Sequence, residues 1–154
     1  MDLGIAGRTA IVCASSRGLG RGCAMSLADN GVNIILNGRD EEATMASADA
    51  IRAAADVTVT PVLADVSTKD GQQALLAACP KPDILVNNNG GPPFRDFREL
   101  SRQDLLDGVT MNFATPIELI QSVIDPMIER GFGRIVNITS VSVKRPVVGL
   151  DLSS

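Results

Sequence analysis

The stretch from Thr9 to Gly22 constrains the fold of this 154-residue chain more than any other part of it. A short apolar, β-branched run gives way to small residues and glycines, and then to a segment that can form a helix, so the pattern predicts a strand, a tight turn and a helix. Gly18 and Gly20 would let the main chain approach a pyrophosphate, whose charge the free N–H groups at the start of the helix would stabilise. The motif therefore favours an anionic dinucleotide as ligand, and a glycine-rich turn without a ligand is the alternative.

Apolar strands alternate with helices along the rest of the chain. Strands are predicted over 9–13, 32–36, 57–63, 83–86 and 134–139, and helices over 18–30, 40–55, 68–79 and 102–130. Because each strand is too apolar to have a solvated face, we expect a parallel sheet covered on both sides through right-handed crossovers. The predicted fold class is α/β, a doubly wound parallel sheet, and one domain spans residues 1–154.

A sheet of this kind binds its ligand at the carboxyl ends of the strands. The residues expected at those ends are nearly all small or polar, which suits a polar ligand. The candidate cofactor-binding residues are Ala14, Ser15, Ser16, Arg17, Gly18, Leu19, Gly20, Asn37, Arg39, Asp65, Val66, Asn87, Asn88, Asn89 and Gly90. Thr139 and Ser140 follow the fifth strand at the same edge.

Composition excludes several classes of function. A net charge of −4 argues against a nucleic-acid partner, since binding to phosphate backbones needs a basic face. The chain has no His, and its three cysteines fit no metal spacing, so we expect no metal site and reduced cysteines in the core. No run approaches the ~18 apolar residues of a membrane span, and the N-terminus lacks the layout of a signal peptide. We expect no membrane partner and a cytoplasmic location.

Five motifs, in order and on suitable elements, resemble those of the short-chain dehydrogenase/reductase family, most closely bacterial members similar to 3-oxoacyl-[acyl-carrier-protein] reductases. Cys13 to Gly20 matches the family's Thr-Gly-x-x-x-Gly-x-Gly but retains only the last two glycines, and Asn87 to Gly90 matches Asn-Asn-Ala-Gly with Asn89 as the one departure. Asp65 matches the acid that contacts adenine. Asn112 matches the helix asparagine of the catalytic tetrad and Ser140 matches the catalytic serine.

The resemblance implies a Rossmann-type oxidoreductase that passes a hydride between nicotinamide C4 and a carbonyl or alcohol carbon. Ser140 would hydrogen-bond the substrate oxygen, and Asn112 would hold a kink in the helix and order a water. A small carbonyl or alcohol substrate is implied, such as a 3-oxoacyl thioester. The family also suggests a dimer or tetramer formed through the helix over 102–130, which carries more apolar residues than one buried stripe needs.

The family's tyrosine position falls at or beside Ser153 when counted from Ser140, and its lysine position lies beyond Ser154. The chain has no Tyr at all. Because the chain breaks off inside the helix that should carry these residues, we favour an incomplete piece of a longer protein over a truncated relative. Some members similar around Lys144-Arg145-Pro146 nevertheless carry serine in place of the tyrosine. A serine hydroxyl is a poor proton donor, because its pKa lies far above the ~10 of a phenol. A relative that binds a dinucleotide without catalysis is the second hypothesis.

The predicted coenzyme is NADP(H) rather than NAD(H). A carboxylate at the end of the second strand would bind the ribose 2′-hydroxyl and repel a 2′-phosphate, but Asn37 occupies that place. Arg17 and Arg39 could both reach the phosphate. The alternative for both arginines is ordinary solvated charge.

Overall fold

The computed structural model describes residues 2–91, 94–145 and 147–153. Pro146 and Ser154, which entered the resemblance, lie outside these ranges. The strands β1 (Thr9–Val12), β2 (Asn33–Gly38), β3 (Val59–Leu63), β4 (Ile84–Asn87) and β5 (Arg134–Asn137) form one sheet in the order β3-β2-β1-β4-β5. All neighbouring pairs are parallel. The strand order reverses direction between β1 and β4, which is where a doubly wound sheet binds its ligand.

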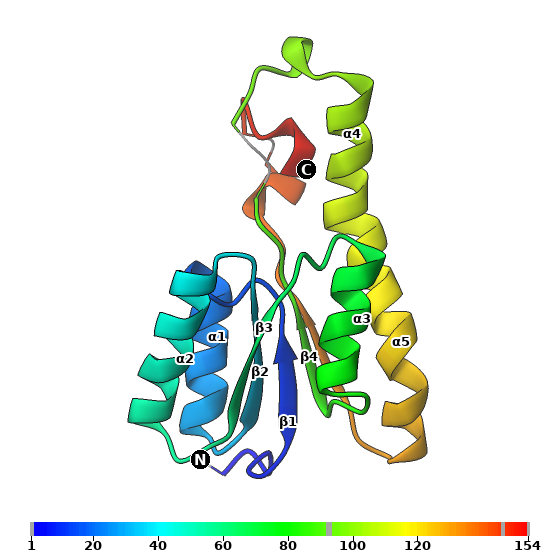
Figure 1. Cartoon of the computed structure of the whole chain (residues 1–154). Helices are drawn as coiled ribbons and strands as arrows, with labels where there is room; N and C mark the ends of the chain where they lie inside the picture. The colour runs from blue at the N-terminus through cyan, green and yellow to red at the C-terminus, as the bar shows by residue number, and fades with distance from the viewer. Residues whose placement is uncertain (1, 92–93, 146, 154) are drawn as a thin grey trace.

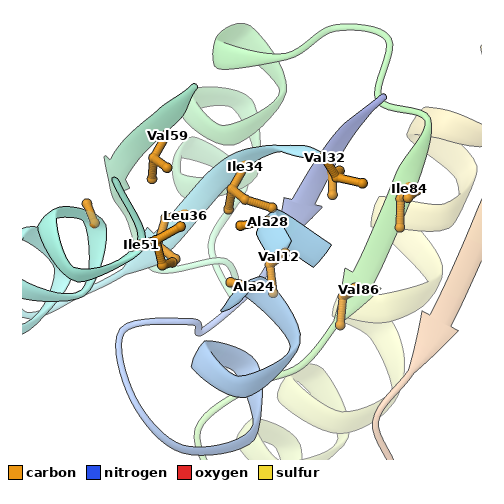
Figure 2. Close-up of a cluster of buried hydrophobic side chains, with 12 residues drawn as sticks. Val12, Ala24, Ala28, Val32, Ile34, Leu36, Ile51, Val59, Ile84 and Val86 are labelled. Atoms are coloured by element: carbon orange, nitrogen blue, oxygen red, sulfur yellow. The ribbon is translucent and has the colours of Figure 1, made fainter. Parts of the chain in front are cut away.

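Helices cover the two faces of the sheet (Figure 1). On one face α1 (Gly18–Asp29) and α2 (Glu41–Ala54) pack on β1, β2 and β3. On the other face α3 (Lys69–Ala78) packs on β2 and β3, and α5 (Thr115–Glu129) packs on β4. Successive strand residues point to opposite faces, so β1 sends Ala10 and Val12 into one core and Ile11 into the other. Figure 2 shows the core between the sheet and the helices α1 and α2.

Local signals that were visible in the sequence determine the helix ends. The Asp40 carboxylate accepts the Ala43 N–H at the start of α2, as predicted for a cap. Thr68 caps α3 in the same way. Ser101 and Asp104 form a capping box at the start of α4 (Arg102–Val109). A π turn over Thr110–Ala114 joins α4 to α5, so the predicted long helix does continue past Pro116.

The bounds of all five strands differ from the prediction by at most two residues. Strand β2 begins one residue late and continues through Asn37 and Gly38, which were expected to start the turn. Strand β5 ends at Asn137. The expectation that every strand is buried on both faces is wrong at both edge strands, because Val136 in β5 and Leu63 in β3 are each 47% exposed. Strands β3 and β5 lie at the two edges of the sheet, so each has a neighbouring strand on one side only. Their apolar residues are therefore less enclosed than those of the inner strands.

The connections above the sheet include short 3₁₀ turns at Phe97–Glu99, Val141–Val143 and Asp151–Ser153. In Figure 1 the two turns near the C-terminus lie beside α4, and the turn at Phe97–Glu99 lies at the top, above the start of α4. The Arg95 N–H donates to the Gly149 carbonyl, which ties the two connections together. Within the described ranges, no helix is long and apolar enough to span a bilayer.

Candidate functional site

A cavity of about 410 Å³ lies at the carboxyl ends of β1, β2, β3 and β4. Four segments that are far apart in the sequence form its wall. Its lining is Ala14, Ser16, Arg17, Gly18, Leu19, Asn37, Gly38, Arg39, Asp40, Ala64, Asp65, Val66, Asn88, Asn89 and Gly90. Twelve of these fifteen residues belong to the predicted cofactor-binding set, which contained neither Gly38, Asp40 nor Ala64.

The first turn has the open geometry expected of an anion cradle. Arg17 is extended at the start of α1, and within the described part of the chain no side chain caps the N–H groups of the first helical turn. Gly18 has φ +58°, and a Cβ built on it would meet nothing within 4 Å. A Cβ on Gly20 would instead collide with the Ala14 carbonyl oxygen, so Gly20 lets the helix pack closely on the turn.

Ala14 occupies the place of the family's glycine in this turn. Its φ is +44°, in the left-handed region where a side chain is unfavourable by about 1–2 kcal/mol. Two hydrogen bonds fix this conformation: the Ala14 N–H donates to Asn37 Oδ1 at 3.0 Å, and Asn88 Nδ2 donates to the Ala14 carbonyl at 3.1 Å. The turn therefore keeps a glycine-like shape although it has lost the glycine.

Asn37 and Ser15 form the frame behind the cavity. Asn37 is 1% exposed, and its Nδ2 donates to the carbonyl oxygens of Val62 and Ala64. The Ser15 hydroxyl is fully buried, donates to the Val12 carbonyl at 2.7 Å and accepts the Asn37 N–H at 3.0 Å. Ser15, Gly20 and Asn87 were predicted as cofactor-binding residues, but among the described residues the lining of this cavity does not include them. Ser15 and Gly20 support the turn from behind, and Asn87 lines the second cavity described below.

Two arginine–aspartate pairs stand at the rim. Arg17 contacts Asp40 at 2.8 Å, and Arg39 contacts Asp65 at 3.4 Å. The hydrogen bond from the Ala43 N–H, followed by Arg17, lowers the pKa of Asp40. Burial alone would raise the pKa of Asp65, but hydrogen bonds from Ser67 and the charge of Arg39 outweigh it, so that pKa is lowered too. Both carboxylates are charged at neutral pH and hold the two guanidinium groups over the cavity.

The Arg39 guanidinium also reaches the loop after β4. A Cβ atom built on Gly90 would lie 3.2 Å from Nη2 of Arg39. Arg39 therefore lies between the end of β3 and the end of β4, across the mouth of the cavity.

Cys13 lies just below the turn and is fully buried. Burial raises the pKa of its thiol to about 12, although the Asn88 N–H partly opposes this. The thiol is protonated at neutral pH, as predicted for a core cysteine. In the described part of the chain, no group of three or more His, Cys, Asp or Glu side chains is arranged to hold a metal ion.

A second cavity of about 260 Å³ lies between the ends of β4 and β5 and the π turn, and it shares Asn88 and Asn89 with the first. The Asn87 Nδ2 donates to Asn137 Oδ1 at 2.9 Å at its wall. The buried Asn87 Oδ1 and Thr115 Oγ1 have no hydrogen-bond partner among the described residues. Asn112 and Thr139 also line this cavity.

The two catalytic candidates are both exposed, and of the two only Asn112 lines the second cavity. Asn112 is part of the π turn, and its Nδ2 donates to the Leu152 carbonyl at 2.9 Å. Ser140 follows β5, and its hydroxyl accepts the Ser142 N–H at 3.2 Å, which caps a 3₁₀ turn. Among the hydrogen bonds of the described residues, none joins Ser140 to Asn112. Asn112 lines the second cavity together with Asn88 and Asn89, and Ser140 follows the carboxyl end of β5, so both residues lie at the end of the sheet that holds the cofactor-binding candidates.

Comparison with known proteins places the chain in a family. The family model for short chain dehydrogenase matches residues 8–152. The uncharacterized oxidoreductase YvaG of Bacillus subtilis (strain 168) is 31% identical over 147 residues, which are 95% of this chain and 56% of that protein. The inactive hydroxysteroid dehydrogenase-like protein 1 of Pongo abelii is 36% identical over 147 residues, which are 91% of this chain and 44% of that protein.

Solved structures of related proteins show the same fold. The L-sorbose reductase of Gluconobacter frateurii, in complex with NADPH and L-sorbose, matches with a TM-score of 0.93 and 26% identity over 99% of this chain and 60% of that one. A 3-oxoacyl (acyl-carrier-protein) reductase of Agrobacterium tumefaciens with NADP bound matches with a TM-score of 0.87 and 31% identity over 97% and 58%. The chain belongs to the short-chain dehydrogenase family of oxidoreductases and has its Rossmann-type fold. It spans about half the length of the curated relatives it matches.

Proposed function

We propose that the first cavity binds a nicotinamide dinucleotide, and that the protein is an NADP(H)-dependent oxidoreductase acting on the carbonyl or hydroxyl group of a small molecule. The observation that carries the proposal is the first cavity itself. The cavity brings together the start of α1, where Gly18 leaves free space, and the ends of four strands. Two arginines, Arg17 and Arg39, lie at its rim. A dinucleotide needs that combination, because its pyrophosphate, ribose and base lie in sequence along such an edge.

The residues of this chain would bind and orient the coenzyme, which supplies the hydride when bound. The free N–H groups at the start of α1 would stabilise the pyrophosphate charge. Asp65 and Val66 would contact the adenine end. Ser140 would hold the substrate oxygen through its hydroxyl, and Asn112 would maintain the π turn beside the reacting end.

The electrostatics of the rim support NADP(H) over NAD(H). The side chain of Asn37 is neutral and turned inward, so no carboxylate at this position faces a ribose. Arg17 and Arg39 are exposed, line the cavity and are held by carboxylates that a 2′-phosphate could replace. A guanidinium on a phosphate contributes about 1.5–3 kcal/mol through charged hydrogen bonds.

Binding of NADPH and NADH to the Arg39→Ala variant tests this preference by calorimetry. We expect NADPH affinity to fall by about 10- to 100-fold and NADH affinity to change by less than about threefold, because only NADPH carries the 2′-phosphate. Arg98→Ala is the matched control, since Arg98 also pairs with an aspartate but lines neither cavity. An equal loss of both affinities would contradict the NADP(H) assignment.

A dinucleotide-binding protein without catalysis is the second candidate. The absence of any Tyr favours it, as does the similarity to a protein described as inactive. Turnover of NADPH by the complete gene product, with 3-oxoacyl thioesters and small ketones, separates the two. Turnover of any of them supports the oxidoreductase, whereas coenzyme binding without turnover across the panel would support the second candidate.

The surface of α4 and α5 supports a homo-oligomer as part of the proposal. Large apolar side chains on this helix are exposed, namely Leu105, Leu106, Val109, Phe113 and Ile117. Contiguous apolar surface of this kind marks interfaces. Sedimentation of the Val109→Glu variant tests it: we expect a shift toward monomer, and an unchanged assembly would contradict a contact through this helix.

A further inference from the structure

The π turn that carries Asn112 is followed by a proline, which cannot continue the hydrogen-bond pattern of the turn. In the π turn, the Thr115 N–H donates to the Thr110 carbonyl, five residues back. The same pattern would require residue 116 to donate to the Met111 carbonyl. Residue 116 is proline and has no N–H. In a continued π pattern the Met111 oxygen therefore loses its main-chain donor, and a donor from outside the helix can replace it.

Asn89 supplies that donor from the end of β4. Its Nδ2 lies 3.2 Å from the Met111 carbonyl oxygen and donates to it. Its Oδ1 accepts the Gly90 N–H at 2.8 Å. The side-chain amide is half-buried, and both its oxygen and its nitrogen bind main chain. Asn89 thus connects two segments 22 residues apart in the sequence.

We propose that Asn89 is a positioning residue, which replaces the hydrogen bond that Pro116 removes and so fixes the π turn against the end of β4. Asn112 is the next residue after Met111, and its Nδ2 donates to the Leu152 carbonyl at 2.9 Å. One connected path therefore runs from β4 through the π turn to the turn at Asp151–Ser153. These hydrogen bonds do not depend on any catalytic activity. Their importance for catalysis rests on the proposed function of Asn112.

A double-mutant cycle between Asn89→Ala and Pro116→Ala tests the compensation in the 154-residue chain without coenzyme. Asn89→Ala alone lowers the folding equilibrium constant about tenfold, because it leaves the Met111 carbonyl without a donor. In the Pro116→Ala background the helix regains an N–H, and the same change lowers the constant less than about twofold. Additive effects in denaturant unfolding would overturn the proposal.

Asn30→Ala provides the matched control, because Asn30 also donates through Nδ2 to a main-chain carbonyl, that of Ser26, at 2.8 Å. Its effect is the same in the unsubstituted chain and in the Pro116→Ala background. Should Asn89→Ala fail to fold, the double variant decides: a folded double variant supports the proposal. A double variant that is unfolded, when Pro116→Ala alone is folded, overturns it.

The position of Asn112 provides a readout that global stability would not move. In a chain labelled with ¹⁵N-asparagine, Asn89→Ala shifts or broadens the side-chain NH₂ signal of Asn112 in the native state, and adding Pro116→Ala restores it. An unchanged signal would overturn the positioning role. Both measurements are made without coenzyme or substrate, so a failure of the proposed function, seen as no binding or turnover, is distinguishable from a failure of this inference.

Discussion

Strands β1 and β5 flank β4 in one sheet, and each places a valine opposite Val86, yet their surroundings differ sharply. Val12 in β1 is fully buried, whereas Val136 in β5 is 47% exposed. Helix α1 covers Val12, while Val136 borders an apolar groove that also contains Cys23 and Leu27 of α1. The cofactor-binding candidates that follow β1 are thus attached to a strand that is buried on both faces of the sheet. The catalytic candidates Asn112 and Ser140 stand on exposed segments next to an open strand.

The largest effect is expected where the packed side of the sheet is most tightly hydrogen-bonded. Asn37→Asp would place a carboxylate against the carbonyl oxygens of Val62 and Ala64, which Asn37 Nδ2 now binds. We expect a loss of about 3–4 kcal/mol in the free energy of unfolding at pH 7. Burial and the two carbonyls raise the folded-state pKa of the new carboxyl, so the loss shrinks as pH falls through that pKa.

Asn33→Asp in the same strand is the control for this prediction. Asn33 uses its Oδ1 to accept the Thr58 N–H, a role that a carboxylate can also fill. Its cost should stay below about 1 kcal/mol in urea unfolding. Equal costs at both positions would contradict the importance of the hydrogen bonds from Asn37 Nδ2 to the Val62 and Ala64 carbonyls.

The second prediction concerns the close approach of α1 to the first turn. Gly20→Ala would bring a methyl group against the Ala14 carbonyl and to 2.9 Å from Asn88 Nδ2. We expect a loss of about 2–3 kcal/mol, because main chain has to move. Gly22→Ala, two residues along the same helix, meets nothing within 4 Å and should instead stabilise by about 0.5–1 kcal/mol. Urea unfolding of both variants tests the pair, and equal effects would contradict the close packing.

Truncating the valine opposite Val86 should destabilise the protein more in β1 than in β5. Val12→Ala should lower the free energy of unfolding by about 2 kcal/mol, since it opens a cavity in a packed core. Val136→Ala should cost less than about 1 kcal/mol, because the side chain is already half in solvent. Denaturant unfolding measures both. A Val136 cost that equals the Val12 cost would show that β5 is covered in solution, for example by a second copy of the chain.

The smallest predicted effect is a stabilisation. Ala14→Gly removes a side chain from a residue with φ +44°. The gain should be about 0.5–1 kcal/mol, since the relief of strain is partly offset by the greater freedom of glycine in the unfolded chain. A loss of stability on thermal unfolding would mean that the Ala14 methyl makes contacts that outweigh the strain.

Much of the frame was predictable from sequence because local signals agree with the fold. The parallel sheet, the caps at Asp40 and Ser101, and most of the cavity lining follow from strand ends and helix starts. The inward role of Asn37 was not predictable, because it depends on carbonyls from β3. Asn89 was visible as a departure from the family motif, but its partner Met111 is set by the register of the π turn. The exposure of β5 depends on packing rather than on its apolar residues.

The proposed binding of a dinucleotide at the start of α1 and the neighbouring strand ends can be mapped residue by residue in solution. Titration of the ¹⁵N-labelled chain with NADP⁺, followed by amide NMR, tests it most directly. We expect the largest shifts at Ser16 to Gly20, further shifts near Arg39 and Asp65, and little change at Arg134 at the opposite end of the sheet. Shifts that are absent from the first turn, or centred at the opposite end of the strands, would contradict it.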